Sequence, residues 1–152
     1  MTATLGLLVF SLIAAPAPRA SAEESPEKVA TEIIARFERA LKDHDLPSIA
    51  AVVADDIVVF ENGHRNEGRK DFRDNHLAPE MEEPSHSQKT GLVKVSASPQ
   101  MAWGYTRTEI FSDASRPAQG THLLWSVYIL EHRRESWKIV SLDWSIAKAT
   151  KG

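Results

Sequence analysis

The chain has no cysteine among its 152 residues. This absence excludes disulfide bonds, thiolate metal ligands, cysteine nucleophiles and lipid attachment through cysteine. Basic residues form no run or stripe, and the formal net charge is −3, so nucleic acid is not expected as a partner. The sequence shows neither a phosphate-binding glycine loop nor a nucleophile motif. The fold must therefore rely on the packing of a hydrophobic core.

The beginning of the chain has the features of a leader peptide. An apolar run from Leu5 to Ala15 precedes a small-residue pattern, Ala-Ser-Ala, at 20–22. Together they predict a secretory signal peptide over residues 1–22, which leaves one domain at 23–152. The apolar run is too short for a transmembrane helix. We therefore expect a periplasmic or secreted protein that has no membrane partner after the leader is removed; the alternatives are an uncleaved anchor or a misassigned start codon.

Two amphipathic helices are predicted at the start of this domain. Ser25 is a typical N-cap, and apolar residues then recur every four positions up to about Asp43. The pair Glu38–Lys42, spaced i,i+4, is expected on the exposed face of this first helix. Asp45 can cap a second, short helix.

A strand, a turn and a third helix are predicted next. Ile57–Phe60 has the composition of a buried strand, and Asn62-Gly63 is a strong turn signal. A third helix is predicted over Gly68–Ala78, and Pro79 is expected to end it, because a proline disfavours helical geometry in the preceding residue. Four strand patterns follow, at 87–97, 101–112, 120–133 and 136–148. Such closely spaced strands form antiparallel hairpins.

The last two strand patterns are apolar on both faces. A sheet with one face in water shows a cleaner alternation of polar and apolar residues. We expect one face to meet the helices and the other to meet a second copy of the chain. The sequence thus predicts a homodimer through the outer face of the sheet.

The order and spacing of several short motifs carry a family resemblance. These are the strand entry at 55–60, Gly68-Arg69 at the start of a helix, Trp103 after a short turn, and Trp137-Lys138-Ile139-Val140. Over about Pro26 to Lys148 the chain resembles the SnoaL-like, nuclear-transport-factor-2-like superfamily.

The resemblance implies a ketosteroid-isomerase-like cone of the α+β class. Three N-terminal helices would pack on a curved, mostly antiparallel sheet around a central pocket. Members that close with a tryptophan strand often carry histidine where Ser141 or Asp143 stands here. The superfamily contains isomerases, cyclases, dehydratases, epoxide hydrolases and non-enzymatic binders, so the fold does not settle the function.

Three residues are candidates for proton transfer or carbonyl polarisation. His76 is expected on the pocket side of the third helix, where it could act as an acid or base, or bind a backbone carbonyl. Asp143 could be a general base if its strand face is the concave one; otherwise it is tied to Arg107 or to a backbone amide. Tyr105 could donate a hydrogen bond to a ligand carbonyl.

Other residues suggest a metal site or a pocket lining. His64, His76 and His86 could supply three nitrogens to zinc or copper, with Glu80 as a further ligand, although no closely spaced ligand motif is present. The alternative is that His64 and His86 are exposed loop residues. The expected pocket-lining residues are aromatic, although tryptophans in such a sheet also serve the core or a dimer; they are Phe60, Phe72, Trp103 and Trp137.

Three functions follow from these candidates. The first is an exported protein that binds a small apolar or carbonyl-bearing molecule and requires no cofactor. The second is a cofactor-independent isomerase, dehydratase or cyclase that uses Asp143 or His76 as its acid or base, with Tyr105 polarising a carbonyl. The third is a periplasmic metal-binding protein that uses the histidine cluster.

Overall fold

The computed structural model describes residues 24–82, 87–111, 122–134 and 136–148. The predicted signal peptide and His86 lie outside these ranges. No helix within them is long and apolar enough to cross a bilayer. The elements are α1 (Pro26–Lys42), α2 (Leu46–Val52), β1 (Val53–Glu61), β2 (His64–Glu67), α3 (Arg69–Phe72), the π-helical turn η1 (Arg73–Leu77), α4 (Ala78–Glu82), β3 (Ser87–Ala97), β4 (Met101–Phe111), β5 (His122–Arg133) and β6 (Ser136–Lys148).

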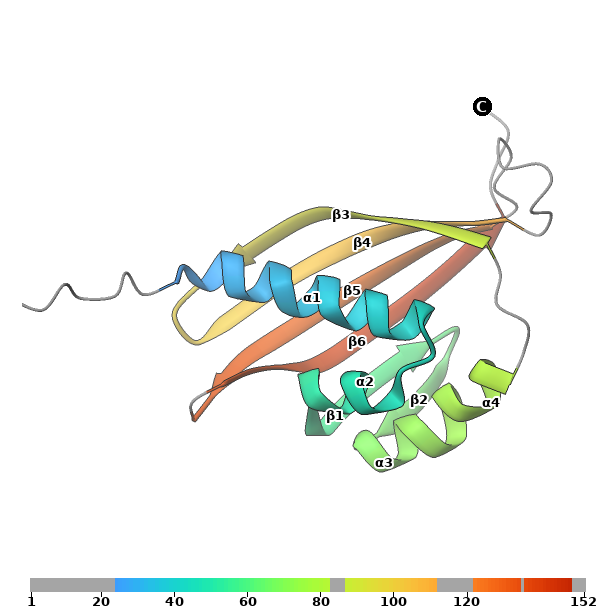
Figure 1. Cartoon of the computed structure of the whole chain (residues 1–152), viewed down its shortest axis with the longest axis horizontal. Coiled ribbons are helices and arrows are strands. Elements are labelled where there is room, and N and C mark those ends of the chain that lie inside the picture. The colour runs from blue at the N-terminus through green and yellow to red at the C-terminus, as the bar shows by residue number, and fades with distance from the viewer. Residues whose placement is uncertain (1–23, 83–86, 112–121, 135, 149–152) are drawn as a thin grey trace, which may run out of the picture.

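The strands form one curved sheet in the order β2-β1-β6-β5-β4-β3. All neighbours pair antiparallel except β1 and β6, which are parallel. In Figure 1, α1 lies across the concave face of the long strands, and the shorter helices gather beside β1 and β2. The predicted α+β class, with helices packed on a mostly antiparallel curved sheet, is confirmed.

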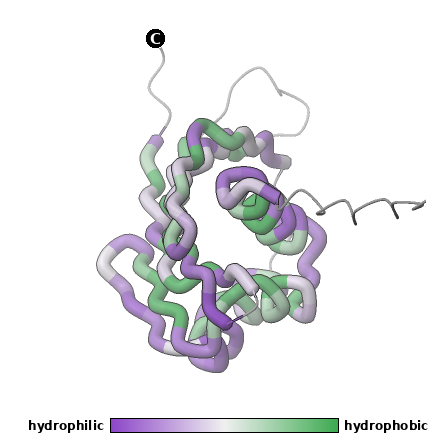
Figure 2. Tube along the Cα trace, turned by 90° about the vertical axis from the view of Figure 1, so that its left-hand side faces the viewer, coloured by the Kyte–Doolittle hydropathy of each residue, from purple (hydrophilic) through white to green (hydrophobic). Residues whose placement is uncertain are grey.

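An N-terminal cap and an apolar stripe account for the formation of α1. The side chain of Ser25 accepts a hydrogen bond from the backbone N–H of Lys28, which satisfies one free donor of the first turn. Ala30, Ile34 and Phe37 lie on the buried side of α1 and belong to the main core cluster. Viewed along α1 in Figure 2, the sheet curves around this helix.

A glycine lets α1 approach β4 closely. A Cβ atom at Gly104 would lie 2.9 Å from Ile34 Cδ1 and 3.0 Å from both the Lys94 carbonyl oxygen and Val95 Cγ2. Real Cβ atoms rarely come that close, and two of these three neighbours belong to the paired strand β3. The glycine therefore brings this part of the helix against the sheet.

A β-bulge in β6 changes which side chains face the helices. Ile129 of β5 pairs with Ser141, but the next residue, Leu130, pairs with Ile139, so Val140 is an extra residue. Ile139 and Leu142, three positions apart, are consequently both fully buried. Strict alternation along β6, on which the placement of Asp143 depended, does not hold across this bulge.

The third helix does not end before Pro79, which corrects the sequence prediction. The N–H of Ala78 bonds to the carbonyl of Arg73, five residues back, which forms the π-helical turn η1. Pro79 then stands in the first turn of α4, where its missing N–H costs no helical hydrogen bond. His76 and Glu80 therefore belong to one continuous helical segment.

The close contact at Gly104 gives a stability prediction. Gly104→Ala should lower the free energy of unfolding by about 1–3 kcal/mol, because the added methyl group overpacks the contact between helix and sheet. Urea denaturation measures the loss. Gly91→Ala in β3 is the matched control, since a Cβ there meets no atom within 4 Å, and its effect should stay within about 0.5 kcal/mol. Equal effects of the two substitutions would contradict the packing argument.

Candidate functional site

A cavity of about 390 Å³ lies where α1, α4 and the sheet come together. Side chains from distant parts of the chain line it. Its apolar lining includes Leu41, Leu77, Met81, Leu124, Trp144 and Ile146, and its polar lining includes Glu38, Glu61, Glu80, Gln88 and Ser126. A concave site with an apolar wall and a few converging polar groups is the usual form of a small-molecule pocket.

Glu38 is a largely buried carboxyl group on the α1 side of this cavity. Thr106 donates a hydrogen bond of 2.8 Å to Oε1 of Glu38, and the Tyr128 hydroxyl donates a second one to the same oxygen. Burial raises the pKa of Glu38, and these two hydrogen bonds offset only part of that rise. Burial also raises the pKa of Tyr128, with Glu38 adding to the effect, so the hydroxyl remains a donor.

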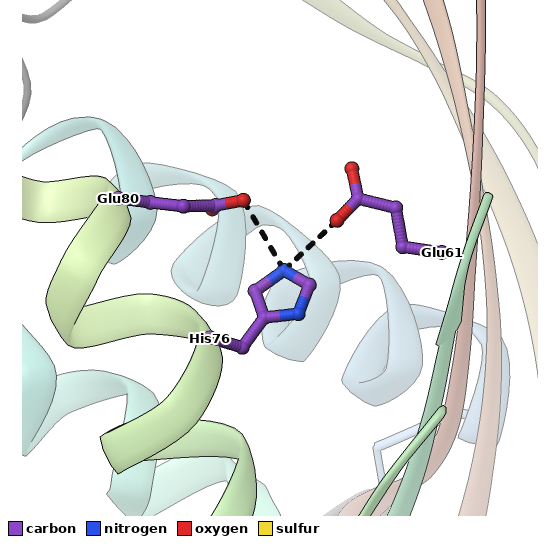
Figure 3. A group of neighbouring side chains, drawn as sticks. All are labelled: Glu61, His76 and Glu80. Atoms are coloured by element: carbon purple, nitrogen blue, oxygen red, sulfur yellow. Dashed lines mark ion pairs between the residues drawn. The ribbon is translucent and has the colours of Figure 1, made fainter. Parts of the chain in front are cut away.

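His76 forms a second polar centre with two other carboxylates. Its Nε2 lies 3.1 Å from Glu61 Oε2 and 3.4 Å from Glu80 Oε1 (Figure 3). The His76 side chain is only 9% exposed, and its Nε2 has no aligned hydrogen bond within the part of the chain that the structure describes. Burial lowers the pKa of His76, but the adjacent carboxylates of Glu61 and Glu80 outweigh burial, and the net pKa is raised.

A series of side-chain contacts orients His76 through its other ring nitrogen, Nδ1. Its Nδ1 lies 3.0 Å from the Asn66 amide oxygen, and Asn66 Nδ2 donates to Asp71 at 3.3 Å. Asp71 also accepts from the Glu67 N–H at 2.9 Å and from Asn75 at 2.6 Å. The Phe72 ring contacts the imidazole, with centroids 5.4 Å apart. The ring orientation is thus set by both packing and hydrogen bonding.

The comparisons with known proteins agree with this architecture. A family model described as a SnoaL-like domain matches residues 30–149, which is most of the chain. The chain belongs to the SnoaL-like domain family. No curated protein matches it.

Solved structures show the same fold at low sequence identity. An NTF2-like protein of unknown function from Pseudomonas putida is 22% identical, with a TM-score of 0.64 over 78% of this chain and 84% of that one. A ketosteroid isomerase-like protein from Erwinia carotovora is 16% identical, with a TM-score of 0.66 over 82% and 97%. An NTF2-like protein of unknown function from Shewanella baltica is 12% identical, with a TM-score of 0.61 over 80% and 94%. These likenesses establish the fold of the SnoaL-like domain and no activity.

Several predicted site residues lie on the outer face of the sheet, away from the cavity. Asp143 pairs across the strands with Phe60 and Val127, and Val127 pairs with Tyr105. Asp143 and Phe60 are exposed, as is Trp103 on the same face. The bulge at Val140 explains why Asp143 faces outward. With strict alternation, Asp143 would lie on the same face as the buried Ile139, and the extra residue places the two on opposite faces. The expected pairing of Asp143 and Tyr105 with His76 in one pocket is therefore not seen.

The other predicted residues divide between the core and the surface. Phe72 is buried beneath His76, and Trp137 stacks on His132 with centroids 5.4 Å apart. Neither lines the cavity. His64 is exposed on β2 and is not part of the group formed by Glu61, His76 and Glu80. Of the predicted metal ligands in the described residues, the structure brings together only His76 and Glu80.

Sequence reasoning missed Glu38 and Glu61. Glu38 was expected in an exposed pair with Lys42, but it follows Ile34 by four residues, within the apolar stripe of α1. A carboxylate at such a position is itself a signal of a buried polar site. Glu61 is the last residue of β1, before the Asn62-Gly63 turn, and nothing in its local sequence distinguishes it from a surface residue.

The pH dependence of stability tests the buried carboxyl of Glu38. Its stabilising contribution should be complete below its ordinary pKa of 4.5 and should disappear as the pH rises through the higher pKa of the folded state. Gln at this position stays neutral and still accepts the bonds from Tyr128 and Thr106. The unfolding free energy of Glu38→Gln should therefore rise relative to the parent above pH 4.5, by about 1.4 kcal/mol for each pH unit that separates the two pKa values.

Urea denaturation at several pH values up to about 8 measures this difference. Glu32→Gln on the exposed side of α1 is the control and should give no such trend. Parallel stability profiles for the parent and Glu38→Gln would show that the pKa of Glu38 is not raised.

Proposed function

We propose that this SnoaL-like domain binds a small, mainly apolar molecule that carries a carbonyl or hydroxyl group. The cavity of about 390 Å³ is the observation that carries the proposal. Pockets of a few hundred Å³ accommodate small organic ligands and bury most of their surface. We also propose that the protein acts outside the cytoplasm, on the strength of the predicted signal peptide at 1–22.

In this proposal Glu38 is the polar group that anchors one end of the ligand. Within the described residues, the hydrogen bonds from Thr106 and Tyr128 both use Oε1 of Glu38, which leaves Oε2 to serve a ligand in the cavity that Glu38 lines. When protonated, this carboxyl can donate to a carbonyl oxygen; when ionised, it can accept from a hydroxyl group. Glu61, Glu80 and Lys42 also line the cavity, so its wall carries charges of both signs.

Catalysis without a cofactor is the alternative function that Glu38 favours. A buried carboxyl group with a raised pKa can act as a general acid or base. In an isomerase or dehydratase, Glu38 would take the role first expected of Asp143, and Tyr128 would hold it in place. Deuterium transferred from heavy water to a carbon atom of the ligand would distinguish this alternative from simple binding.

A neutral fluorescent probe tests the cavity directly. N-phenyl-1-naphthylamine should bind saturably, with increased emission, to the full chain. Ile146→Trp should weaken binding by at least about tenfold, which corresponds to 1.4 kcal/mol, because the larger side chain fills the cavity. Ile146 lines the cavity and is 41% exposed, so the substitution should be tolerated.

Leu92→Trp is the matched control for this experiment. Leu92 is 43% exposed, similar to Ile146, but does not line this cavity. Its variant should bind the probe as the parent does. Absence of saturable binding, or equal loss in the two variants, would count against the proposed pocket.

We further propose that a second copy of the chain covers the outer face of the sheet. Trp103, Trp125, Val127 and Ile129 are all more than one-third exposed there. Tyr105 stacks on Trp103, with centroids 6.3 Å apart, so the aromatic side chains form a continuous patch. A soluble monomer rarely exposes such a contiguous apolar surface, and a twofold dimer would bury it against itself.

Light scattering after size exclusion tests the dimer. The parent should have twice the mass of one chain, and Ile129→Lys should have the mass of one chain, because an unpaired ammonium group would be buried in the interface. Ile146→Lys, at a similarly exposed position on the opposite face of the sheet, should remain dimeric. A parent that elutes with the mass of a single chain would overturn the proposal.

A further inference from the structure

We propose that Glu61, His76 and Glu80 bind a divalent transition-metal ion on the wall of the cavity. The three residues come from β1, η1 and α4, and their side chains converge in Figure 3. One nitrogen or oxygen atom from each lies within 4.8 Å of the others. This cluster differs from the histidine set predicted from the sequence, because Glu61 takes part and His64 does not.

The observed spacing suits a metal ion. A tetrahedral ion with ligands at about 2.0–2.1 Å places neighbouring ligand atoms about 3.3 Å apart. His76 Nε2 lies 3.1 Å from the Glu61 oxygen and 3.4 Å from the Glu80 oxygen. These two separations match a tetrahedral ion. The Glu61 and Glu80 oxygens lie within 4.8 Å of each other, and a movement of the exposed Glu80 side chain would complete the coordination.

The contacts behind His76 determine which ring nitrogen is available. The Asp71 carboxylate only accepts hydrogen bonds, so Asn66 must direct its amide NH₂ group toward Asp71. The Asn66 oxygen then faces His76 Nδ1, which must carry a hydrogen atom and donate it. In the neutral ring, Nε2 consequently presents its lone pair to the carboxylates. Metal-binding histidines are commonly oriented through their other nitrogen in this way.

A cation satisfies these three atoms better than a proton alone. Nε2 is buried, yet no acceptor in the described residues is aligned with a hydrogen atom on it. No lysine or arginine within those residues forms an ion pair with Glu61, whose charged partner is His76. Without a proton or a metal ion, the Nε2 lone pair would face the Glu61 carboxylate at 3.1 Å in a half-buried site. A metal ion would bind all three directly.

The three proposed ligand atoms limit which metals would bind at this site. One imidazole nitrogen and two carboxylate oxygens suit zinc, iron or manganese, and the chain has no cysteine to favour a soft metal. Zinc is the suitable probe because it imposes little geometric preference of its own. Glu61 and Glu80 line the cavity, so a fourth coordination position could be filled from the cavity side by water.

Titration calorimetry with zinc tests the site on the chelator-treated full chain, without a histidine tag or added organic ligand. One zinc ion should bind per chain. Glu80→Gln should weaken binding by about tenfold or more; the Glu80 side chain is 56% exposed, so this variant should fold. Asn66→Ala should weaken binding by about 10–100-fold through loss of the His76 orientation. Circular dichroism checks that each variant is folded.

Two matched controls separate this site from adventitious binding. Glu82→Gln changes an exposed carboxylate of the same helix, and His64→Gln changes an exposed histidine on the strand beside Glu61. Both variants should bind zinc as the parent does. Absence of stoichiometric zinc in the parent, or an equal loss in Glu82→Gln and Glu80→Gln, would overturn the site. Because the titration uses no organic ligand, its outcome is independent of the proposed pocket function.

Discussion

The packing of α1 against the concave face of the sheet determines where the cavity can exist. At Gly104 the absence of a side chain lets Ile34 approach the backbone of the sheet. Further along the helix, Glu38 meets Thr106 and Tyr128 through hydrogen bonds, and Leu41 borders open space. One end of the helix is thus closed against the sheet and the other borders a pocket. The position of the pocket therefore depends on how closely each part of this helix approaches the sheet, and Gly104 of β4 permits the close contact with Ile34.

Two polar centres border this cavity, and they are stabilised in different ways. Glu38 is a single carboxyl supported by neutral hydroxyl donors, so burial dominates its pKa. His76 faces two carboxylates, whose charges overcome the effect of burial on its pKa. The first arrangement favours a neutral acid and the second favours a cation, whether a proton or a metal ion. The pocket can therefore present a hydrogen-bond donor and a positive centre within a lining that is otherwise rich in carboxylates.

The order of the elements and the approximate limits of the long strands could be predicted from local sequence, but the faces of the strands and the end of the third helix could not. The Ser25 cap, the Asp45 cap and the long strands follow from capping chemistry and apolar patterns. The bulge at Val140 leaves no comparable signal, yet it decides the side of the sheet on which Asp143 lies. The prediction that the third helix ends before Pro79 was wrong for a similar reason, because a π-helical turn places this proline where it is tolerated. Long-range pairing and backbone irregularity, rather than propensity, determined the composition of the site.

The π-helical turn also has a consequence for the chemistry. In η1 the N–H of Ala78 reaches the carbonyl of Arg73, and the helical segment continues through Pro79 to Glu80. A helix that ended at Ala78 would leave Glu80 in a connecting segment, free of the geometry that brings it to His76. The irregular turn is thus part of the geometry that brings His76, Glu80 and Glu61 together. Such turns occur often at functional sites, and here one accounts for a convergence of three side chains that no sequence motif announces.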